Sequence, residues 1–329
     1  MRVLVTGATG FLGTSLIPLL EQRGHRLTLA LRTSESADRL PGQSAQSVRR
    51  TVVVGEIDAR TDWRDALQDA EAVIHLAARA HVFDVTADEE AAFVRINSSG
   101  TDRLVEQSIE ADVERFVLMS SIGAVTQASE VRVTLDTPCA PSTAYGRSKL
   151  AAERALIERA AGSEMGWTIL RPTLVYGPGN PGNMQRLIAL VKRGWPLPLS
   201  SIRNRRSFTF VGNLADATVT ALSHPGARDT VFLVADGEDV STPELIQKIA
   251  ALTGARTRLF GVPVPVLLGL AQGADGIASA SGISLPFGAQ SVRRLVSSLY
   301  VDMEALRAKL DWTPPYSLDE GLRCMLTPP

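Results

Sequence analysis

The chain has 329 residues, 45% of them hydrophobic, which is enough for one large α/β domain or for an ordinary domain with a smaller partner. Its 34 basic and 35 acidic residues leave a formal net charge of −1, so no global field attracts nucleic acid or an anionic membrane and any anion must be bound locally. Two distant cysteines, Cys139 and Cys324, exclude a disulfide framework or a zinc spacing, and no stretch has the pattern of a signal peptide or a membrane span. We expect a soluble, cytoplasmic protein without a metal.

Short apolar runs alternate with longer stretches of helical periodicity through the first half of the chain. Most of these runs are apolar at consecutive positions, which is typical of strands buried on both faces of a parallel sheet. Their order predicts a Rossmann-like, doubly wound α/β fold. The expected strands are 3–6, 27–31, 52–54, 72–76, 116–120 and 167–170, and the expected helices include 11–22, 88–110 and 144–159.

A glycine-rich turn joins the first expected strand to the first helix. Gly7, Gly10 and Gly13 are spaced by three residues, and Phe11 and Leu12 begin the helix between them. Glycines at such a turn let the backbone approach a pyrophosphate at the positive end of a helix. The pattern favours a bound dinucleotide, and the alternative is a tight turn without a ligand.

The second expected strand ends without the acidic residue that usually binds an unmodified adenosine ribose. Arg32, followed by Thr33 and Ser34, occupies that place instead. A guanidinium there suits a 2′-phosphate, so NADP is slightly favoured over NAD. Alternatively, Arg32 stacks on the adenine or is simply solvated.

Tyr145 and Lys149 lie four residues apart at the start of an expected helix and therefore share one face. An ammonium beside a tyrosine, together with an oxidised nicotinamide, favours the phenolate that acid-base chemistry needs. Ser120 and Ser121 close a strand at the edge of the sheet where ligands bind, so a serine hydroxyl can reach the same reacting oxygen. Each piece alone is more often an ordinary helix face or cap, and the specificity lies in their combination.

After Arg171 and Pro172 the regular alternation of strands and helices ends. Prolines and glycines concentrate at 176–182 and 194–198. We expect residues 1–172 to form the dinucleotide-binding domain and residues 173–329 to form a smaller, interleaved substrate-binding lobe, with a cleft between them.

At this point the chain resembles the extended short-chain dehydrogenase/reductase family, within it the NAD-dependent epimerases and dehydratases of nucleotide sugars. The resemblance covers nearly the whole chain and includes the glycine turn, Gly55-Glu56-Ile57, His75-Leu76-Ala77-Ala78, Asn97 with Gly100-Thr101, Ser120-Ser121, Tyr145 to Lys149, Arg171-Pro172 and Tyr176-Gly177-Pro178-Gly179.

The family implies a role for each matching residue. Tyr145 would be the acid-base residue at the sugar C4 oxygen, Lys149 would hold the nicotinamide ribose, and Ser121 would bond the reacting oxygen. Of the remaining cofactor-binding residues, Glu56 and Ile57 would contact the adenine, Ala77 and Ala78 would line the pyrophosphate and ribose, and Asn97 would brace the site. His75 is interpreted as a buried, satisfied core residue.

The second half carries the residues that the family places on its substrate. By resemblance, Asn183 would lie over the sugar or diphosphate and Arg206 would clamp the diphosphate. The alternative, on charge alone, is that Arg206 and its neighbours Arg203 and Arg205 belong to a solvated loop. A second family arginine has no clear counterpart, because the spacing of Arg293 and Arg294 does not match.

An unusually apolar stretch covers residues 262–271. The simplest interpretation is that it packs on the sheet or on a dimer neighbour. A sharper hypothesis is a greasy face that touches a membrane or a polyprenyl-linked sugar.

The resemblance implies an enzyme that carries out redox chemistry at C4 of a nucleotide-diphosphate sugar, such as a UDP-N-acetylhexosamine or its 4-keto-6-deoxy derivative, for surface polysaccharide synthesis. Because Arg32 stands where the ribose-binding acid usually lies, a 4-ketoreductase is favoured. The alternative is a UDP-sugar 4-epimerase that acts on a UDP-sugar or on a polyprenyl-linked sugar. A 4,6-dehydratase is disfavoured because an Asp-Glu pair is missing after Ser121. From another class, a non-catalytic dinucleotide sensor stays open. A homodimer through 101–110 and 149–159 is expected by resemblance.

Overall fold

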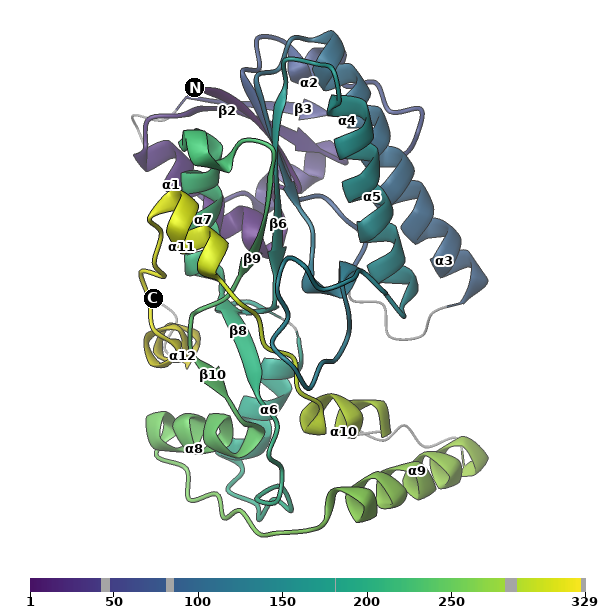
Figure 1. The fold of residues 1–329 in the computed structure, drawn as a ribbon, viewed down its shortest axis with the longest axis vertical. Helices are drawn as coiled ribbons and strands as arrows, with labels where there is room; N and C mark the ends of the chain where they lie inside the picture. Colours follow the sequence, from purple (N-terminus) through teal and green to yellow (C-terminus); the bar gives the residue numbers. More distant parts are fainter. Residues whose placement is uncertain (43–47, 81–85, 181, 282–288, 327–329) are drawn as a thin grey trace.

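The protein is described from a computed structural model that covers residues 1–42, 48–80, 86–180, 182–281 and 289–326. Its main feature is a seven-stranded parallel sheet in the order β3-β2-β1-β4-β5-β6-β9 (Figure 1). The strands are β1 (Arg2–Thr6), β2 (Arg26–Leu31), β3 (Arg49–Val53), β4 (Ala72–His75), β5 (Arg115–Met119), β6 (Gly166–Pro172) and β9 (Thr230–Val234). This order confirms the predicted doubly wound, Rossmann-like fold.

Helices cover both faces of this sheet, as its uninterrupted apolar strands require. On one face, α1 (Phe11–Gln22), α7 (Val211–Ser223) and α11 (Glu304–Leu310) enclose a core that includes Val3, Val5 and Leu16. On the other, α2 (Arg64–Leu67), α4 (Gly100–Glu110) and α5 (Ala144–Ala160) enclose a core built on Leu4, Trp63 and Phe116 (Figure 1).

The expected helix over 88–110 is present but is not uniform. It consists of α3 (Ala87–Phe93), a π-helical segment η2 (Val94–Ser99) and α4. π-helical turns are frequent at functional sites, and this one carries Asn97.

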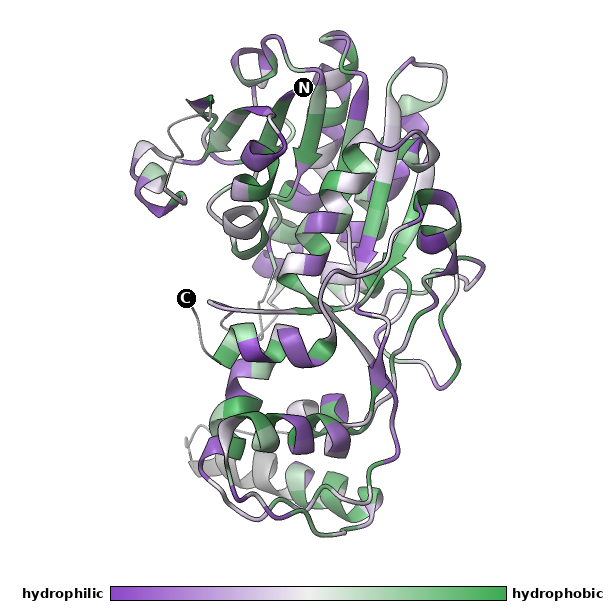
Figure 2. Cartoon of the chain, turned by 90° about the vertical axis from the view of Figure 1, so that its left-hand side faces the viewer, coloured by the Kyte–Doolittle hydropathy of each residue, from purple (hydrophilic) through white to green (hydrophobic). Residues whose placement is uncertain are grey.

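A smaller lobe lies below the sheet in Figures 1 and 2. Its three-stranded sheet has the order β10-β8-β7, with β7 (Leu174–Tyr176), β8 (Arg206–Phe210) and β10 (Asp239–Val240). Around it lie α6 (Asn183–Lys192), α8 (Thr242–Thr253), α9 (Val264–Ser281), α10 (Ala289–Val296) and α12 (Leu318–Leu326). Short 3₁₀ segments η1 (Ser34–Arg39), η3 (Ile122–Ala124) and η4 (Pro225–Ala227) complete the described helical segments.

The chain crosses between the two lobes more than once. After building β8 it returns to the large sheet through α7 and β9, and later through α11. The predicted boundary at residues 172 and 173 therefore marks the first crossing, and parts of the second half complete the sheet of the first.

A buried carboxylate ties the lobes together where β9 ends. Asp236 Oδ1 accepts hydrogen bonds from the Phe210 amide at 2.7 Å and from Asn213 Nδ2 at 2.8 Å. The Tyr176 hydroxyl donates to its Oδ2 at 2.9 Å. Burial nevertheless raises the pKa of Asp236 to about 6, since three donors replace its hydration only in part.

This raised pKa predicts that Asp236→Asn stabilises the protein near neutral pH. A normal aspartate has a pKa of about 3.9, so ionisation costs the folded state free energy above pH 6 and costs nothing below about pH 4. Asparagine keeps the acceptor for Phe210 and Asn213 without the charge, but its NH2 group replaces Oδ2 and leaves the Tyr176 hydroxyl only the Leu318 carbonyl as acceptor. After this loss we expect a net gain of roughly 1 to 2 kcal/mol. Urea unfolding at several pH values measures it. The gain should shrink as the pH falls from neutrality towards 4, and a gain or loss independent of pH would contradict this account.

Candidate active site

The glycine turn after β1 is packed without space for side chains. Gly7 has a φ of +71°, and a Cβ there would lie 2.7 Å from the backbone nitrogen of Ala77. A Cβ on Gly13 would lie 2.5 Å from the carbonyl oxygen of Ala8. The turn therefore lies directly against the residues that follow β4, which brings Ala77 beside the start of α1.

The N-terminus of α1 is suited to an anion. Gly10 is its N-cap residue, no described side chain caps it, and its first turn contains no acidic residue. The first amide groups of the helix, from Phe11, Leu12 and Gly13, have no intrahelical partner and lie at the positive end of the helix dipole. These residues fit the pyrophosphate of a dinucleotide.

The ends of β2 and β3 lie next to this turn in the sheet and bring two charged side chains together. Arg32 Nη1 lies 3.6 Å from Glu56 Oε1, and both side chains are about two-thirds exposed at 65%. Ile57 packs so closely on the start of α4 that a Cβ on Gly100 would lie 2.5 Å from its Cγ2. The predicted adenosine-binding residues therefore lie along one edge of the sheet.

Tyr145 and Lys149 both lie on the first turns of α5, which begins after the N-cap residue Thr143. The helix starts so close to η3 that a Cβ on Gly146 would collide with the carbonyl oxygen of Gly123. This approach places Tyr145 next to Ser121, close enough for the serine hydroxyl to influence the pKa of the tyrosine. The Phe93 ring packs edge-on against Tyr145 with centroids 6.0 Å apart.

Burial alters the acidity of this pair. It raises the pKa of Tyr145, and the neighbouring Ser121 hydroxyl lowers it in part. Burial lowers the pKa of Lys149 to about 8, with Glu153 opposing the change. The lysine Nζ donates to the Met119 carbonyl at 2.7 Å. The arrangement has the parts of an acid-base site: a hydroxyl to be ionised, a neighbouring serine and a cation four residues away.

Glu153 holds α5 to the sheet from one further turn along the helix. Its carboxylate is buried and accepts hydrogen bonds from Arg171 Nε at 2.9 Å and from Arg171 Nη2 at 2.6 Å. Ser120 also donates to it. Sequence reasoning did not single out Glu153; the signal was its position four residues after Lys149 and eight after Tyr145, on the same face of the helix.

His75 and Asn97 form a chain of hydrogen bonds behind the site. Thr6 Oγ1 lies 2.7 Å from His75 Nδ1, and His75 Nε2 lies 2.9 Å from Thr101 Oγ1. Because Thr101 donates its hydroxyl proton to the Asn97 carbonyl, it accepts from His75, which fixes the Nε2–H tautomer. Burial and the nearby Lys149 charge lower the pKa of His75 to about 3. His75 is thus a neutral, satisfied core residue, as predicted.

Asn97 is itself buried. Its side-chain nitrogen donates to Ser148 Oγ and to the Arg79 carbonyl, both at 3.0 Å, and its oxygen accepts from the Arg79 amide at 2.7 Å. These bonds fit the bracing role that the sequence indicated, and a direct contact with a cofactor stays a prediction.

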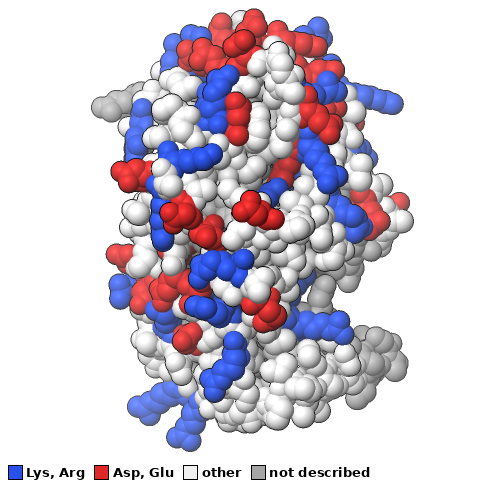
Figure 3. Space-filling view, in the orientation of Figure 1, with Lys and Arg blue, Asp and Glu red and all other residues white. Residues whose placement is uncertain are grey.

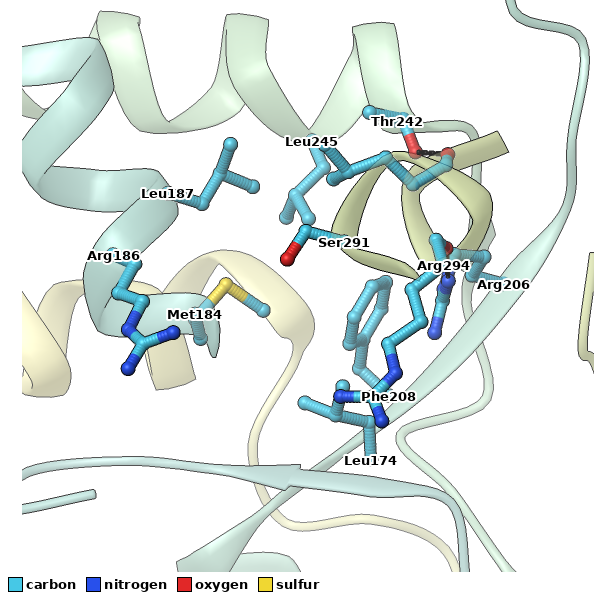
Figure 4. A pocket seen from close by; sticks show the side chains of 11 residues that line it. Leu174, Met184, Arg186, Leu187, Arg206, Phe208, Thr242, Leu245, Ser291 and Arg294 are labelled. Carbon is cyan, nitrogen blue, oxygen red and sulfur yellow. Dashed lines mark hydrogen bonds between the residues drawn. The ribbon is translucent and has the colours of Figure 1, made fainter. Parts of the chain in front are cut away.

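The smaller lobe contains a pocket lined by three arginines, one of which is Arg186. Arg206, at the start of β8, and Arg294, on α10, both line it, and Arg206 Nη1 donates to the Arg294 carbonyl (Figure 4). Burial and the second guanidinium lower the pKa of Arg206 to about 10, so it stays charged at neutral pH. No acidic side chain is among the residues that line this pocket, which suits an anion. The other lining residues are Leu174, Met184, Arg186, Leu187, Phe208, Thr242, Leu245, Ser291 and Leu295.

The structure separates the neighbouring arginines that sequence alone left together. Arg205 is exposed and lies over the Tyr300 ring, 5.2 Å from its centroid, and Arg203 is exposed. Arg294, whose spacing matched no pattern, shares the pocket with Arg206. Asn183 begins α6, and its side chain lies outside the described residues.

The fold is that of a dinucleotide-dependent enzyme, and the residues gathered at the carboxyl ends of its strands fit such an enzyme. The comparisons agree: the model of the NAD dependent epimerase/dehydratase family matches residues 3–235, and the chain belongs to that family of enzymes.

Relatives and solved structures of this family match over almost the full length. A UDP-glucose 4-epimerase from Vibrio cholerae is 37% identical and aligns with 98% of this chain and 93% of its own. An Escherichia coli O157:H7 N-acetyl-α-D-glucosaminyl-diphospho-undecaprenol 4-epimerase is 24% identical, again over 98% of this chain and 93% of its own. The structure of MoeE5 in complex with UDP-glucuronic acid and NAD is 28% identical with a TM-score of 0.74, covering 98% of this chain and 96% of that one.

We expect Gly13→Ala to disrupt the glycine turn. The added methyl group meets backbone carbonyls that cannot rotate away, so the variant should lose about 2 kcal/mol or more of stability and most of its affinity for NAD. Thermal unfolding and NAD titration by calorimetry measure the two effects.

Gly269→Ala is the matched control, because Gly269 also lies in a helix but a Cβ there meets nothing within 4 Å. It should unfold at the same temperature as the parent or slightly higher. If Gly13→Ala binds NAD as well as this control does, the turn is not the pyrophosphate site.

Proposed function

We propose that the enzyme transfers hydride at C4 of a nucleotide-diphosphate sugar. The observation that carries the proposal is the placement of Tyr145 next to Ser121 with Lys149 on the same face of α5, together with a helix terminus suited to an anion. A nicotinamide cofactor would supply the hydride acceptor and donor. A relative named UDP-glucose 4-epimerase and a solved structure that holds UDP-glucose and NAD support the substrate class.

Within this reaction, Tyr145 takes the proton from the C4 hydroxyl or returns one to the C4 oxygen. Ser121 donates a hydrogen bond to the same oxygen, which stabilises negative charge there as the bond order changes. Lys149 lowers the cost of the Tyr145 phenolate through its positive charge and binds the nicotinamide ribose. Arg206 and Arg294 hold the sugar diphosphate, since one guanidinium group can donate two parallel hydrogen bonds to a phosphate.

Two net outcomes share this half-reaction. A 4-ketoreductase acting on the 4-keto-6-deoxy derivative of a UDP-N-acetylhexosamine is our first candidate, because the exposed Arg32 replaces the ribose-binding acid and suits an exchangeable NADP(H). A 4-epimerase, which keeps its cofactor and returns the hydride to the other face, is the second, and the 37% identical relative favours it. A sugar carried on a polyprenyl diphosphate presents the same diphosphate to the arginines. We also propose that α4 and α5 form a homodimer interface.

The purified enzyme, incubated with NADPH and a 4-keto UDP-sugar, tests the function. We expect stoichiometric oxidation of NADPH by the parent and a loss of about 10²- to 10⁴-fold in kcat for Tyr145→Phe, which keeps the ring but removes the proton donor. The affinity for the cofactor should be unchanged in the variant. Tightly bound NAD with interconversion of UDP-sugar epimers and no net consumption would instead establish the epimerase.

If Tyr145→Phe turns over as fast as the parent under either assay, the acid-base assignment is wrong. If neither sugar reacts although NAD binds, the proposed C4 chemistry is wrong and a sensing role gains support.

The preference for NADP rests on Arg32, so Arg32→Ala should weaken NADPH binding selectively. Losing a charge-assisted contact with the 2′-phosphate costs about 1.5 to 3 kcal/mol, or roughly 10- to 100-fold in Kd. The Kd for NADH, which lacks that phosphate, should change less than about threefold and serves as the internal control. A parent enzyme that binds NADH far more tightly than NADPH would contradict the preference.

A further inference from the structure

The smaller lobe exposes large apolar side chains at its end farthest from the seven-stranded sheet. Val266 and Leu270 of α9 are 50% and 65% exposed, and Phe260, just before that helix, is 48% exposed. Trp195, which follows α6, is 60% exposed. Figure 1 shows α9 and the chain leading into it along this lower edge. We refer to these four residues as the apolar end.

The exposure of Val266 and Leu270 is built into the packing of α9. Leu267 and Ala271, one position further on, face inwards and are each only 8% exposed, and Leu267 belongs to the core of the lobe. Because residues four apart share a helix face, Val266 and Leu270 form a second apolar strip that points away from this core. Part of the stretch 262–271 thus packs on the smaller lobe, and part of it is uncovered.

Backbone hydrogen bonds hold the remaining two residues of the apolar end on neighbouring segments. The Leu197 amide donates to the Arg258 carbonyl at 2.8 Å, and the Phe260 amide donates to the Leu197 carbonyl at 3.0 Å. Trp195 and Phe260 therefore lie on paired segments, and their exposure is fixed by the fold.

The same segments carry basic residues and lack acidic ones. In the sequence no acid occurs between Glu164 and Asp216, nor between Glu244 and Asp275. The exposed cations in these stretches include Lys192, Arg193, Arg256 and Arg258. The Arg193 guanidinium lies over the Trp195 ring, 5.5 Å from its centroid. On the face shown in Figure 3, acidic side chains gather higher up, and the lower end is basic or uncharged.

We propose that the apolar end docks on the surface of an anionic lipid bilayer. Apolar side chains surrounded by Lys and Arg, with a tryptophan at the boundary, match the interface between acyl chains and phosphate headgroups. Of the described helices none is long and apolar enough to cross a membrane, so the contact is peripheral. A second copy of this chain fits less well, because self-association through this end would bring like charges together.

Docking at the apolar end brings the arginine pocket of the smaller lobe close to the lipid. Helix α10 packs on α9 and also contributes Ser291, Arg294 and Leu295 to the arginine pocket. A bilayer at the apolar end would therefore lie beside the pocket. The docking itself rests on the exposed residues and does not depend on the proposed reaction.

Flotation of the full chain with vesicles tests the proposal. We expect recovery with vesicles of mixed phosphatidylglycerol and phosphatidylcholine, and little recovery with phosphatidylcholine alone or at high salt. The double variant Val266→Ser/Leu270→Ser should bind at least about tenfold more weakly, because two inserted side chains lose their apolar contact. Arg256→Glu/Arg258→Glu should lose the preference for anionic vesicles.

Val53→Ser is the matched control, since Val53 is 56% exposed at the end of edge strand β3, in the other lobe. It should float like the parent, and thermal unfolding checks that every variant is folded. A blue shift of the exposed Trp195 fluorescence on adding anionic vesicles, absent in Trp195→Phe, would report insertion directly.

Three results would overturn the proposal. These are no flotation with anionic vesicles, equal losses in Val53→Ser and in the α9 double variant, or a dimer in sedimentation velocity that the double variant dissociates. The last would assign the apolar end to a second copy of the chain. The C4 redox assays use substrates in solution, so their outcome is independent of this one.

Discussion

The first turn of helix α5 packs directly on the backbone of Gly123 in η3, with no side chain between them, and the proposed chemistry depends on that contact. Gly146 permits the approach, and any larger residue would push the helix away and separate Tyr145 from Ser121. One turn beyond Lys149, the buried Glu153 carboxylate fastens the same helix to Arg171 on β6. The helix that carries the proposed acid-base pair is therefore held by backbone packing at its first turn and by an ion pair in its middle.

This anchoring has an electrostatic consequence. Lys149 is buried, and its charge is balanced from one side only, by Glu153, whose carboxylate is already paired with Arg171. The lowered pKa of Lys149 shows that burial outweighs this attraction. His75, on the other side, stays neutral and adds no further repulsion. Burying the ammonium costs the folded protein free energy. It leaves a cation that can stabilise a phenolate, and perturbed groups of this kind are typical of active sites.

The elements that sequence predicts well are those whose signal is local. Gly7 and Gly13 follow from a strand, a turn and a helix within a few residues, and the alternation of apolar runs gives the sheet. The partnership of Glu153 with Arg171 could not be predicted in this way, because the two residues lie on different elements and meet only when α5 packs on β6. Arg294 joins Arg206 across 88 positions of the chain, and β9 joins the sheet from beyond the expected boundary. Such pairings depend on tertiary packing that carries no periodic pattern.

The formal net charge illustrates the same limit at the scale of the whole molecule. A sum of −1 suggests a protein indifferent to anionic surfaces. Screening in physiological salt acts over about 8 Å, far less than the length of a chain this size, so each end of the molecule presents its own charge to its surroundings. The acidic residues lie mainly on the large sheet domain, whereas the stretches around Lys192 and Arg256 contain none. The net charge therefore conceals an uneven distribution of acidic and basic residues. This distribution determines which surface of the enzyme attracts an anion.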